Sequence, residues 1–318
     1  MQIIRNLNKI KNALPQLAIP QLALAIGNFD GVHLGHMSII NEIKKIAKEK
    51  NISSAILTFE PHPVAFFQPD KARDFRITNL AQKLKIFKEQ QIDYVIILPF
   101  NQNLANIEAY DFIQKILVKS LNVKSLVIGY DFIFGKNREG NFSLLEKESK
   151  NFDFARRFDL MEISALKKSQ EICSSSFIRK LLKDGKVVES NQFLGRNFTI
   201  TGIVNEGRKL ARQLGFPTAN LIAKPHIIKP KFGVYKTLTF IPHLNQKFPS
   251  ITNFGIKPTV QEEKIPLYET HIPNFNQDLY GKKIEVEFID FVREEKKFAS
   301  LEELKRQILD DLEILKRV

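Results

Sequence analysis

The stretch Gly-Asn-Phe-Asp-Gly-Val-His-Leu-Gly-His at residues 27–36 decides the fold of the first part of this chain, because it joins an apolar run to an amphipathic one. Residues 22–26 are mostly aliphatic, and apolar side chains recur at helical spacing from Ile39 to Ala47. We therefore expect a buried strand, a glycine-rich turn and a helix over 38–50. His33 and His36 then lie near a helix N-terminus, where free N–H groups attract phosphate and glycine lets the backbone approach a ligand.

Two other interpretations of this histidine pair were weighed. The pair could be half of a zinc site, but the other four histidines lie elsewhere, Cys173 is the only cysteine, and the sequence has no HExxH or CxxC spacing. The pair could also be structural, since a four-residue HxGH pattern is weak evidence by itself. Its place after an apolar strand favours phosphate handling.

Apolar runs alternate with helical patterns through the first half of the chain, which is typical of βαβ units in a parallel sheet. Ligands of such sheets bind at the carboxyl ends of the strands, so we expect the loops that follow the strands to converge on one crevice. The expected strands cover 22–26, 55–59, 94–98 and 125–128, and the expected helices cover 38–50, 80–90 and 110–121.

The second half of the chain has a different pattern of apolar and turn residues. A helix over 174–185 is predicted to end the first domain, with a boundary near 186–193. Short apolar runs at 198–204, 234–240 and 284–291 then alternate with turn residues, as in an antiparallel sheet or barrel. From Ser300 to Val318 apolar residues recur every three or four positions, and Ser300 with Glu303 predicts a capping box at the start of a terminal helix.

Five further segments follow 27–36 in order: FEPHP at 59–63, GYDFIFG at 129–135, SSSFIR at 174–179, GFPTAN at 215–220 and ETH at 269–271. Together the six segments resemble those of the bacterial bifunctional riboflavin kinase/FMN adenylyltransferases, also called FAD synthetases. The resemblance implies an α/β nucleotidyltransferase domain with a Rossmann-like parallel sheet over 1–185. A mainly antiparallel β-barrel riboflavin kinase domain with a C-terminal helix is implied over 186–318.

For the first domain, the resemblance implies adenylylation of FMN to FAD by ATP, with His33, His36 and Arg179 as catalytic contacts to phosphate. Turn geometry is an alternative role for the Asn and Asp residues of these loops, and a surface ion pair is one for Arg179. Cys173 is interpreted as a small buried residue and not a nucleophile. The implied ATP- or phosphate-binding residues are Gly27, Asn28, Phe29, Asp30, Gly35, Ser175 and Ser176, and the implied flavin-binding residues are Phe59, His62 and Asp131.

For the second domain, the resemblance implies phosphorylation of riboflavin to FMN, with Glu269 as the catalytic base. Thr218 and Asn220 alternate along an extended segment, so their oxygens can share one face and serve Mg²⁺, although Pro, Thr and Asn are also ordinary turn residues. Gly202, Gly207 and Gly215 are the implied ATP-binding glycines. The loop from Gly207 to Gly215 could act as a lid, although a rigid loop has the same glycines. The sequence departs from the family at Ala211, Lys257 and Asn274, usually glycine, arginine and aspartate, which puts the kinase rate in question.

Composition is that of an ordinary globular protein: 318 residues, 43% hydrophobic and 26% charged. No apolar run is long enough for a membrane helix, the N-terminus lacks a signal-peptide pattern, and we expect a cytoplasmic protein. The net charge of +13 comes from scattered lysines, so we expect small anionic substrates and neither nucleic acid nor a membrane as partner. The oligomeric state is left open.

Two rival functions were considered. A nucleotidyltransferase for another substrate would explain only the first 185 residues. A flavin- or RNA-binding regulator without catalysis would not need the histidines, Thr218, Asn220 and Glu269.

Overall fold

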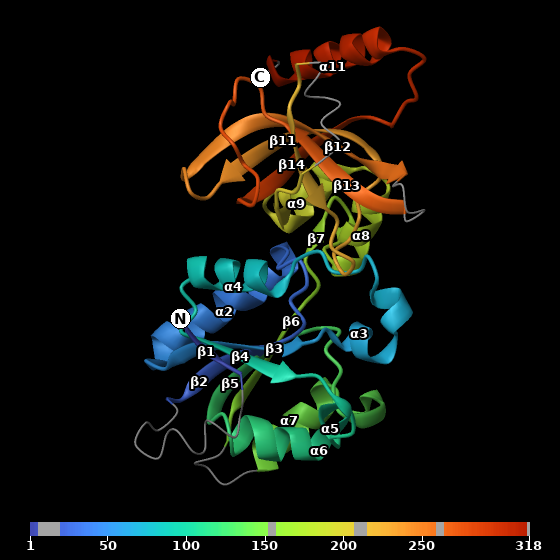
Figure 1. Cartoon of the computed structure of the whole chain (residues 1–318). Helices are drawn as coiled ribbons and strands as arrows, with labels where there is room; N and C mark the ends of the chain where they lie inside the picture. Colours follow the sequence, from blue (N-terminus) through green and yellow to red (C-terminus); the bar gives the residue numbers. More distant parts are fainter. Residues whose placement is uncertain (6–19, 152–156, 207–214, 259–263, 317–318) are drawn as a thin grey trace. The chain divides into compact units, whose positions relative to one another are not determined.

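The computed structural model describes residues 1–5, 20–151, 157–206, 215–258 and 264–316. The chain forms two compact units, shown in Figure 1. Unit 1 comprises Met1–Ala72 and Thr78–Ser174, and unit 2 comprises Arg73–Ile77 and Ser175–Val318. Within the described residues, no helix is both long and apolar enough to cross a membrane.

Unit 1 is built on a six-stranded sheet, counted over the described residues, in which every neighbouring pair is parallel. The strands lie in the order β1-β4-β3-β2-β5-β6, so β2 has β3 on one side and β5 on the other. This reversal of strand order is the place where open α/β sheets bind ligands. The strands are β1 (Gln2–Ile4), β2 (Leu22–Ile26), β3 (Ser53–Glu60), β4 (Tyr94–Pro99), β5 (Val123–Gly129) and β6 (Asp159–Ile163).

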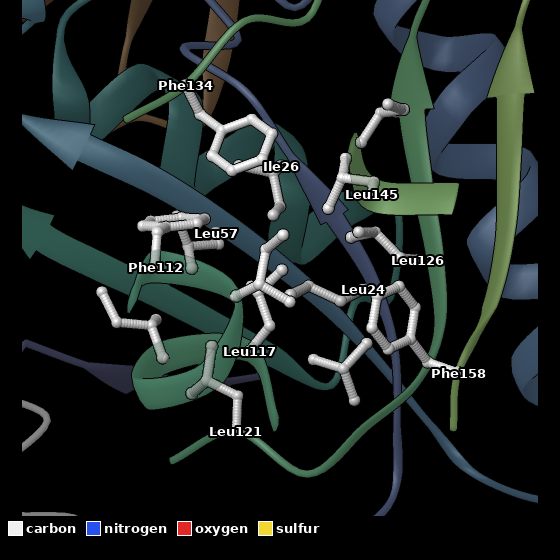
Figure 2. Close-up of a cluster of buried hydrophobic side chains, with 14 of the residues drawn as sticks. Leu24, Ile26, Leu57, Phe112, Leu117, Leu121, Leu126, Phe134, Leu145 and Phe158 are labelled. Atoms are coloured by element: carbon white, nitrogen blue, oxygen red, sulfur yellow. The ribbon is translucent and has the colours of Figure 1, made fainter. Parts of the chain in front are cut away.

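Both faces of this sheet are covered by helices (Figure 1). In β2, Leu24 and Ile26 belong to one buried cluster, whereas Ala23 and Ala25 belong to the other. Figure 2 shows the first cluster, in which Phe112 and Leu117 of the covering helix pack over these strand residues. The helices of unit 1 are α2 (Leu34–Lys50), α3 (Pro63–Phe67), η1 (Pro69–Ala72), α4 (Leu80–Glu89), α5 (Gln102–Ala105), α6 (Ala109–Asp111), η2 (Phe112–Val118), η3 (Lys136–Arg138) and α7 (Phe142–Asn151).

Two expected helices have different bounds. The helix after the glycine-rich turn begins at Leu34, four residues before the expected start, because the side chain of His33 caps it. The helix expected over 110–121 begins as α6 and continues as η2 with π-helical bonding, for example from Lys119 N to Gln114 O at 3.1 Å. Its apolar residues still face the core, so the predicted periodicity holds through the wider turn.

Unit 2 contains a six-stranded antiparallel sheet, again counted over the described residues, in the order β10-β13-β12-β11-β14-β9. Its two ends meet, because Asn205, just after β9, bridges Asn220 of β10 and donates its N–H to the Asn220 carbonyl at 2.9 Å. The predicted antiparallel barrel is confirmed. The strands are β9 (Phe198–Ile203), β10 (Thr218–Ile222), β11 (Gly233–Ile241), β12 (Gln246–Pro258), β13 (Lys264–His271) and β14 (Lys283–Arg293).

In the part of unit 2 that the structure describes, the barrel is accompanied by α8 (Ser175–Lys183), α9 (Val187–Leu194) and α11 (Leu301–Lys316). The stretch 186–193, where the sequence texture changes, lies mostly in α9, so the 185/186 boundary falls inside unit 2 and stays a prediction. The terminal helix is present, and the Ser300 hydroxyl accepts from Glu303 N at 3.1 Å. In a capping box the Glu303 carboxylate would accept from Ser300 N. Here it accepts from Ala299 N at 2.9 Å, one residue earlier.

Candidate active sites

The turn between β2 and α2 places two apolar residues in left-handed backbone conformations. Phe29 has φ 49° and Val32 has φ 38°, and both side chains are buried. Such conformations are unfavourable for residues with bulky side chains and persist only where packing holds them. The Phe29 ring lies 5.1 Å from the His36 ring and 5.7 Å from Phe87, between centroids. Core packing therefore shapes this turn.

Buried polar contacts hold the same turn to its surroundings. Asp30 Oδ1 accepts from Thr78 N at 3.2 Å, and Gly31 N donates to Thr78 Oγ1 at 3.0 Å. The carbonyl of Asn28 accepts from Lys83 Nζ at 3.1 Å, although this lysine is buried. Sequence reasoning missed Thr78 and Lys83, because a lysine in an amphipathic helix looks like a surface residue.

The structure brings His33 and His36 together at the start of α2. Their rings are stacked, with centroids 3.7 Å apart and planes 20° apart. His33 is the N-cap, and its Nδ1 accepts from His36 N at 3.4 Å. At Gly35 a Cβ would lie 3.2 Å from the His33 ring and 3.1 Å from the Cys173 carbonyl oxygen, so a side chain here would crowd the histidine. The predicted location of both histidines at a helix N-terminus is confirmed.

The other residues predicted for this site follow β2, β3 and β5, which are neighbours in the sheet. Phe59 is the penultimate residue of β3, and its ring packs against Phe100, with ring centroids 5.9 Å apart. His62 is buried and caps α3, since its Nδ1 accepts from Val64 N at 3.2 Å. Asp131 is exposed in the turn after β5, and Gly27 donates to the Leu57 carbonyl at 3.1 Å. Their ligand contacts stay predictions.

Ser175, Ser176 and Arg179 belong to α8, in unit 2. Arg179 Nε donates to the Phe75 carbonyl at 2.8 Å, and the guanidinium carbon lies 3.7 Å from the centroid of the Phe75 ring. These two contacts are with a carbonyl and an aromatic face. The phosphate-binding roles of the two serines and Arg179 stay predictions.

In unit 2 the strand register aligns the predicted kinase residues. Asn220 of β10 lies directly opposite Glu269 of β13, and Thr218 lies opposite His271. Asn253 of β12 lies opposite Glu269 on its other side. Because directly opposite residues of antiparallel strands point to the same face, these five side chains share one face of the sheet.

A row of hydroxyl groups on the opposite face fixes this register. Thr252 Oγ1 lies 2.9 Å from Thr270 Oγ1 and 2.9 Å from Thr237 Oγ1, and Thr237 Oγ1 lies 2.8 Å from Ser250 Oγ. All of these hydroxyl-bearing residues are buried. Thr252 directly precedes Asn253, and Thr270 directly follows Glu269. The buried hydrogen bonds therefore join β11, β12 and β13 at the positions next to the polar face.

Asn220 offers an oxygen that suits a cation. Its Oδ1 is buried and has no hydrogen-bond partner among the described residues. Buried polar atoms are normally satisfied, so such an atom indicates a ligand. Within the same residues, no group of three or more His, Cys, Asp or Glu side chains could hold a metal. Neutral oxygens of Thr218 and Asn220 fit Mg²⁺, which keeps water and phosphate oxygens as its other ligands.

His271 ties the segment before β10 to β13. Its Nδ1 lies 2.8 Å from the Pro217 carbonyl oxygen, and its ring meets that of Phe216 edge to face, with centroids 5.6 Å apart. Burial lowers the pKa of the imidazole, and the hydrogen bond to Pro217 opposes this effect. His271 therefore holds in place the backbone segment that leads into Thr218 and Asn220.

The remaining predicted positions of the kinase site are placed in part. Gly207 and Ala211 lie outside the described residues, as does most of the loop 207–215. Gly215 has φ 90°, a conformation for which glycine is needed. Gly202 lies in β9, Lys257 in β12, and Asn274 has φ 59°, which asparagine tolerates well.

The comparisons with known proteins agree with this geometry. A family model described as FAD synthetase matches residues 17–177, and one described as riboflavin kinase matches residues 194–318. A bifunctional riboflavin kinase/FMN adenylyltransferase of Buchnera aphidicola subsp. Schizaphis graminum is 39% identical over 100% of this chain and 98% of its own. The protein of the same name from Escherichia coli strain K12 is 36% identical over 98% of this chain and 96% of its own.

Among the solved structures that are similar, one covers the whole chain. A crystal structure from Streptococcus pneumoniae, titled as a macrolide-efflux protein, superposes with a TM-score of 0.86 and 27% identity, and covers 100% of both chains. The likeness extends over the whole fold, parallel sheet and barrel alike.

Proposed function

Because the chain belongs to the family of bifunctional riboflavin kinase/FMN adenylyltransferases, we propose that its two activities use separate sites, one in each unit. The enzyme phosphorylates riboflavin to FMN and adenylylates FMN to FAD, with ATP as the co-substrate of both reactions. The assignment of residues to these steps is the proposal developed below.

In unit 1, a phosphate oxygen of FMN attacks the α-phosphorus of ATP, and pyrophosphate leaves. Negative charge develops on the transferred group and on the leaving group, so fixed donors accelerate the step. His33 and His36 supply these donors at the start of α2, where the helix dipole also favours an anion. Gly35 leaves room for their stacking, and no covalent intermediate is needed.

In unit 2, the terminal hydroxyl of riboflavin attacks the γ-phosphorus of ATP, and ADP leaves. Glu269 accepts the hydroxyl proton, a role for which a positioned carboxylate is suited. Asn253 and Asn220 flank it across the sheet, and the buried hydroxyl row holds β12 and β13, the strands of Asn253 and Glu269, in register. Glu269 is half-buried, so it can reach both substrate and solvent.

We assign the Mg²⁺ of the kinase reaction to Thr218 and Asn220. The support is the buried Asn220 Oδ1 without a partner among the described residues, together with the hydroxyl two positions earlier on the same face. When bound, Mg²⁺ neutralises charge on the phosphates of ATP.

Two simpler proposals accompany this assignment. The partners are small anionic molecules and neither nucleic acid nor a membrane, because the positive charge is scattered along the sequence. A cytoplasmic location agrees with the single cysteine, since reducing compartments disfavour disulfides.

The observation that supports the proposal for unit 1 is the stacked pair of His33 and His36 at the N-terminus of α2. Chromatographic analysis of the reaction products tests both sites. The purified chain, with Mg²⁺ and ATP, should convert riboflavin to FAD. His36→Ala should accumulate FMN, whereas Glu269→Ala should convert added FMN to FAD but leave riboflavin unchanged. If FMN reacts and riboflavin does not in the unaltered chain, the departures at Ala211, Lys257 and Asn274 have silenced the kinase.

A further inference from the structure

Cys173 lies against His33, the first histidine of the proposed site in unit 1, although its sequence context indicates no chemical role for it. Its Sγ is 3.6 Å from His33 Nδ1, across 140 positions of sequence, and the residue is buried. The short hairpin of β7 (Lys167–Lys168) and β8 (Glu171–Ile172) precedes it, and Cys173 N donates to the Leu166 carbonyl at 2.8 Å. The backbone of Cys173 is thus held at the start of α2.

The hydrogen bonds around this contact have a defined direction. The backbone N–H groups of Leu34 and Gly35, in the first turn of α2, donate to the sulfur of Cys173. The N–H of His36 is directed at His33 Nδ1, so this ring nitrogen acts as an acceptor. A proton on Nδ1 would face the His36 N–H. This N–H is a long donor at 3.4 Å, so the S–H of Cys173, with its sulfur 3.6 Å from Nδ1, can share the same lone pair.

We propose that Cys173 is a positioning residue for adenylyl transfer: its S–H donates to His33 Nδ1 and holds the neutral imidazole as the Nε2–H tautomer. The opposite ring nitrogen then carries the proton that the phosphate of ATP requires, which is how a partner on one nitrogen sets the chemistry of the other. Burial raises the pKa of the Cys173 thiol, so it keeps its proton at neutral pH. The inference rests on the proposed role of His33.

The tautomer can be measured directly in the unaltered protein. With ¹⁵N-labelled histidine, long-range ¹⁵N–¹H correlation spectra distinguish protonated from unprotonated ring nitrogens, and His33→Gln assigns the signal. We expect His33 to be Nε2–H at pH 7.5. An Nδ1–H tautomer would overturn the proposal without any variant of Cys173.

Two variants at the same position then separate the hydrogen bond from packing. Cys173→Ser keeps an O–H donor, so the Nε2–H tautomer and the rate of FAD formation from FMN should be preserved within about twofold. Cys173→Ala removes one of the two donors to Nδ1 and leaves only the long contact from the His36 N–H, so the Nε2–H fraction of His33 should fall. We expect kcat to fall about tenfold, the lower end for loss of a group that orients a functional histidine. Riboflavin kinase activity should be unchanged in both variants, because Glu269 lies in unit 2.

The outcomes also separate this inference from the role of His33 itself. If Cys173→Ala keeps both the tautomer and kcat, the positioning role of Cys173 is wrong while the role of His33 stands. If His33→Gln forms FAD from FMN at the normal rate, the proposed site in unit 1 is wrong. Equal losses in the serine and alanine variants would indicate packing alone and would overturn the hydrogen-bond proposal.

Discussion

At the scale of single residues, Asn220 is the sharpest test of the kinase site. Its buried Oδ1 has no hydrogen-bond partner among the described residues, so Asn220→Ala breaks no bond at that atom. We expect the free energy of unfolding to change by no more than about 1 kcal/mol. The affinity for Mg²⁺ in the kinase reaction should fall by at least about tenfold, since even outer partners of a metal have effects of that size.

Titration of Mg²⁺ against kinase rate, together with urea unfolding, makes this measurement. Gln246→Ala is the control, because that amide is exposed at the start of β12. A large loss of stability with an unchanged Mg²⁺ requirement would assign Asn220 to structure and remove it from the metal site.

His271 predicts how the stability of the barrel depends on pH. Burial lowers its pKa below the ordinary 6.5, so the unfolded chain binds the proton more readily than the folded protein does. Stability therefore rises with pH wherever the unfolded state holds more protons, and it should fall as the pH drops from 7.5 through 6.5. His271→Gln, which keeps a donor for the Pro217 carbonyl, should flatten this dependence.

Hydrogen exchange of the β10 and β13 amides in urea, measured between pH 5.5 and 7.5, reports on this region. His243→Gln is the matched control, since His243 is exposed in the turn between β11 and β12. An unchanged slope in His271→Gln would mean that His271 does not link proton binding to folding.

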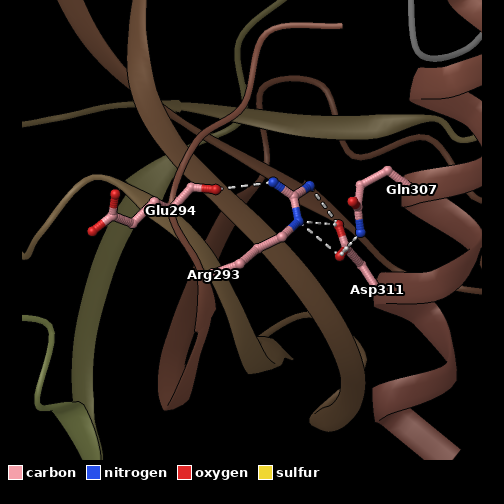
Figure 3. A network of polar contacts seen from close by, with 4 residues as sticks. All are labelled: Arg293, Glu294, Gln307 and Asp311. Atoms are coloured by element: carbon pink, nitrogen blue, oxygen red, sulfur yellow. Dashed lines mark hydrogen bonds and ion pairs between the residues drawn. The ribbon is translucent and has the colours of Figure 1, made fainter.

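At the scale of elements, one polar network attaches α11 to β14. Figure 3 shows Arg293 at the end of β14 facing Asp311 of α11. The contact is bidentate, with Nε to Oδ1 at 2.9 Å and Nη2 to Oδ2 at 2.7 Å, and Gln307 Nε2 adds a bond to Asp311 Oδ1 at 3.0 Å. The aspartate is buried and the arginine is mostly covered. A bidentate contact of this kind restricts the relative orientation of the two side chains and also strengthens their interaction.

Asp311→Ala should destabilise unit 2 strongly, because it leaves the guanidinium charge covered and uncompensated. We expect a loss of about 2–3 kcal/mol, below the range for fully buried pairs because Arg293 keeps some solvent contact. Asp310→Ala, at the exposed neighbouring position, should change stability by less than about 0.5 kcal/mol. Urea unfolding compares the two, and equal effects would mean that the network does not hold α11.

Elements were predictable where local signals are strong. The alternation of apolar runs located β2 and the other central strands, and α11 followed from its spacing and from Ser300. Helix ends were less predictable: α2 starts at Leu34 because an imidazole, an uncommon cap, accepts from His36 N. The bulge of η2 had no local signal, since its apolar residues repeat as in an ordinary helix.

At the scale of the whole molecule, each unit has its own core and its own proposed site, so the two activities should be separable in trans. A mixture of His36→Ala and Glu269→Ala proteins should form FAD from riboflavin, with FMN released by the first variant and used by the second. Chromatography of products over time makes the measurement, with each variant alone as control. FMN without FAD in the mixture would mean that FMN passes only within one chain.

The path of the chain between the units could not be expected from the sequence. The chain passes between units at 72/73, 77/78 and 174/175, so Arg73–Ile77 belongs to unit 2 although both flanking segments belong to unit 1. Asp74 N and Arg76 N donate to the carbonyls of Pro225 and His226, at 2.9 Å each. Nothing in a segment of five residues indicates a hydrogen-bond partner some 150 positions away.

The sequence by itself determined the central strands and the main helices between them, the class of each unit and the positions of the chemical groups at strand ends and helix starts. These follow from periodicity, caps and turns, which act between residues a few positions apart. Only the tertiary structure decided which distant polar residues come together: Cys173 meets His33, Thr78 meets Asp30, and Asn220 lies opposite Glu269 on the neighbouring strand. Such pairs are set by packing and strand register between distant segments, and neither partner carries a local mark of the other.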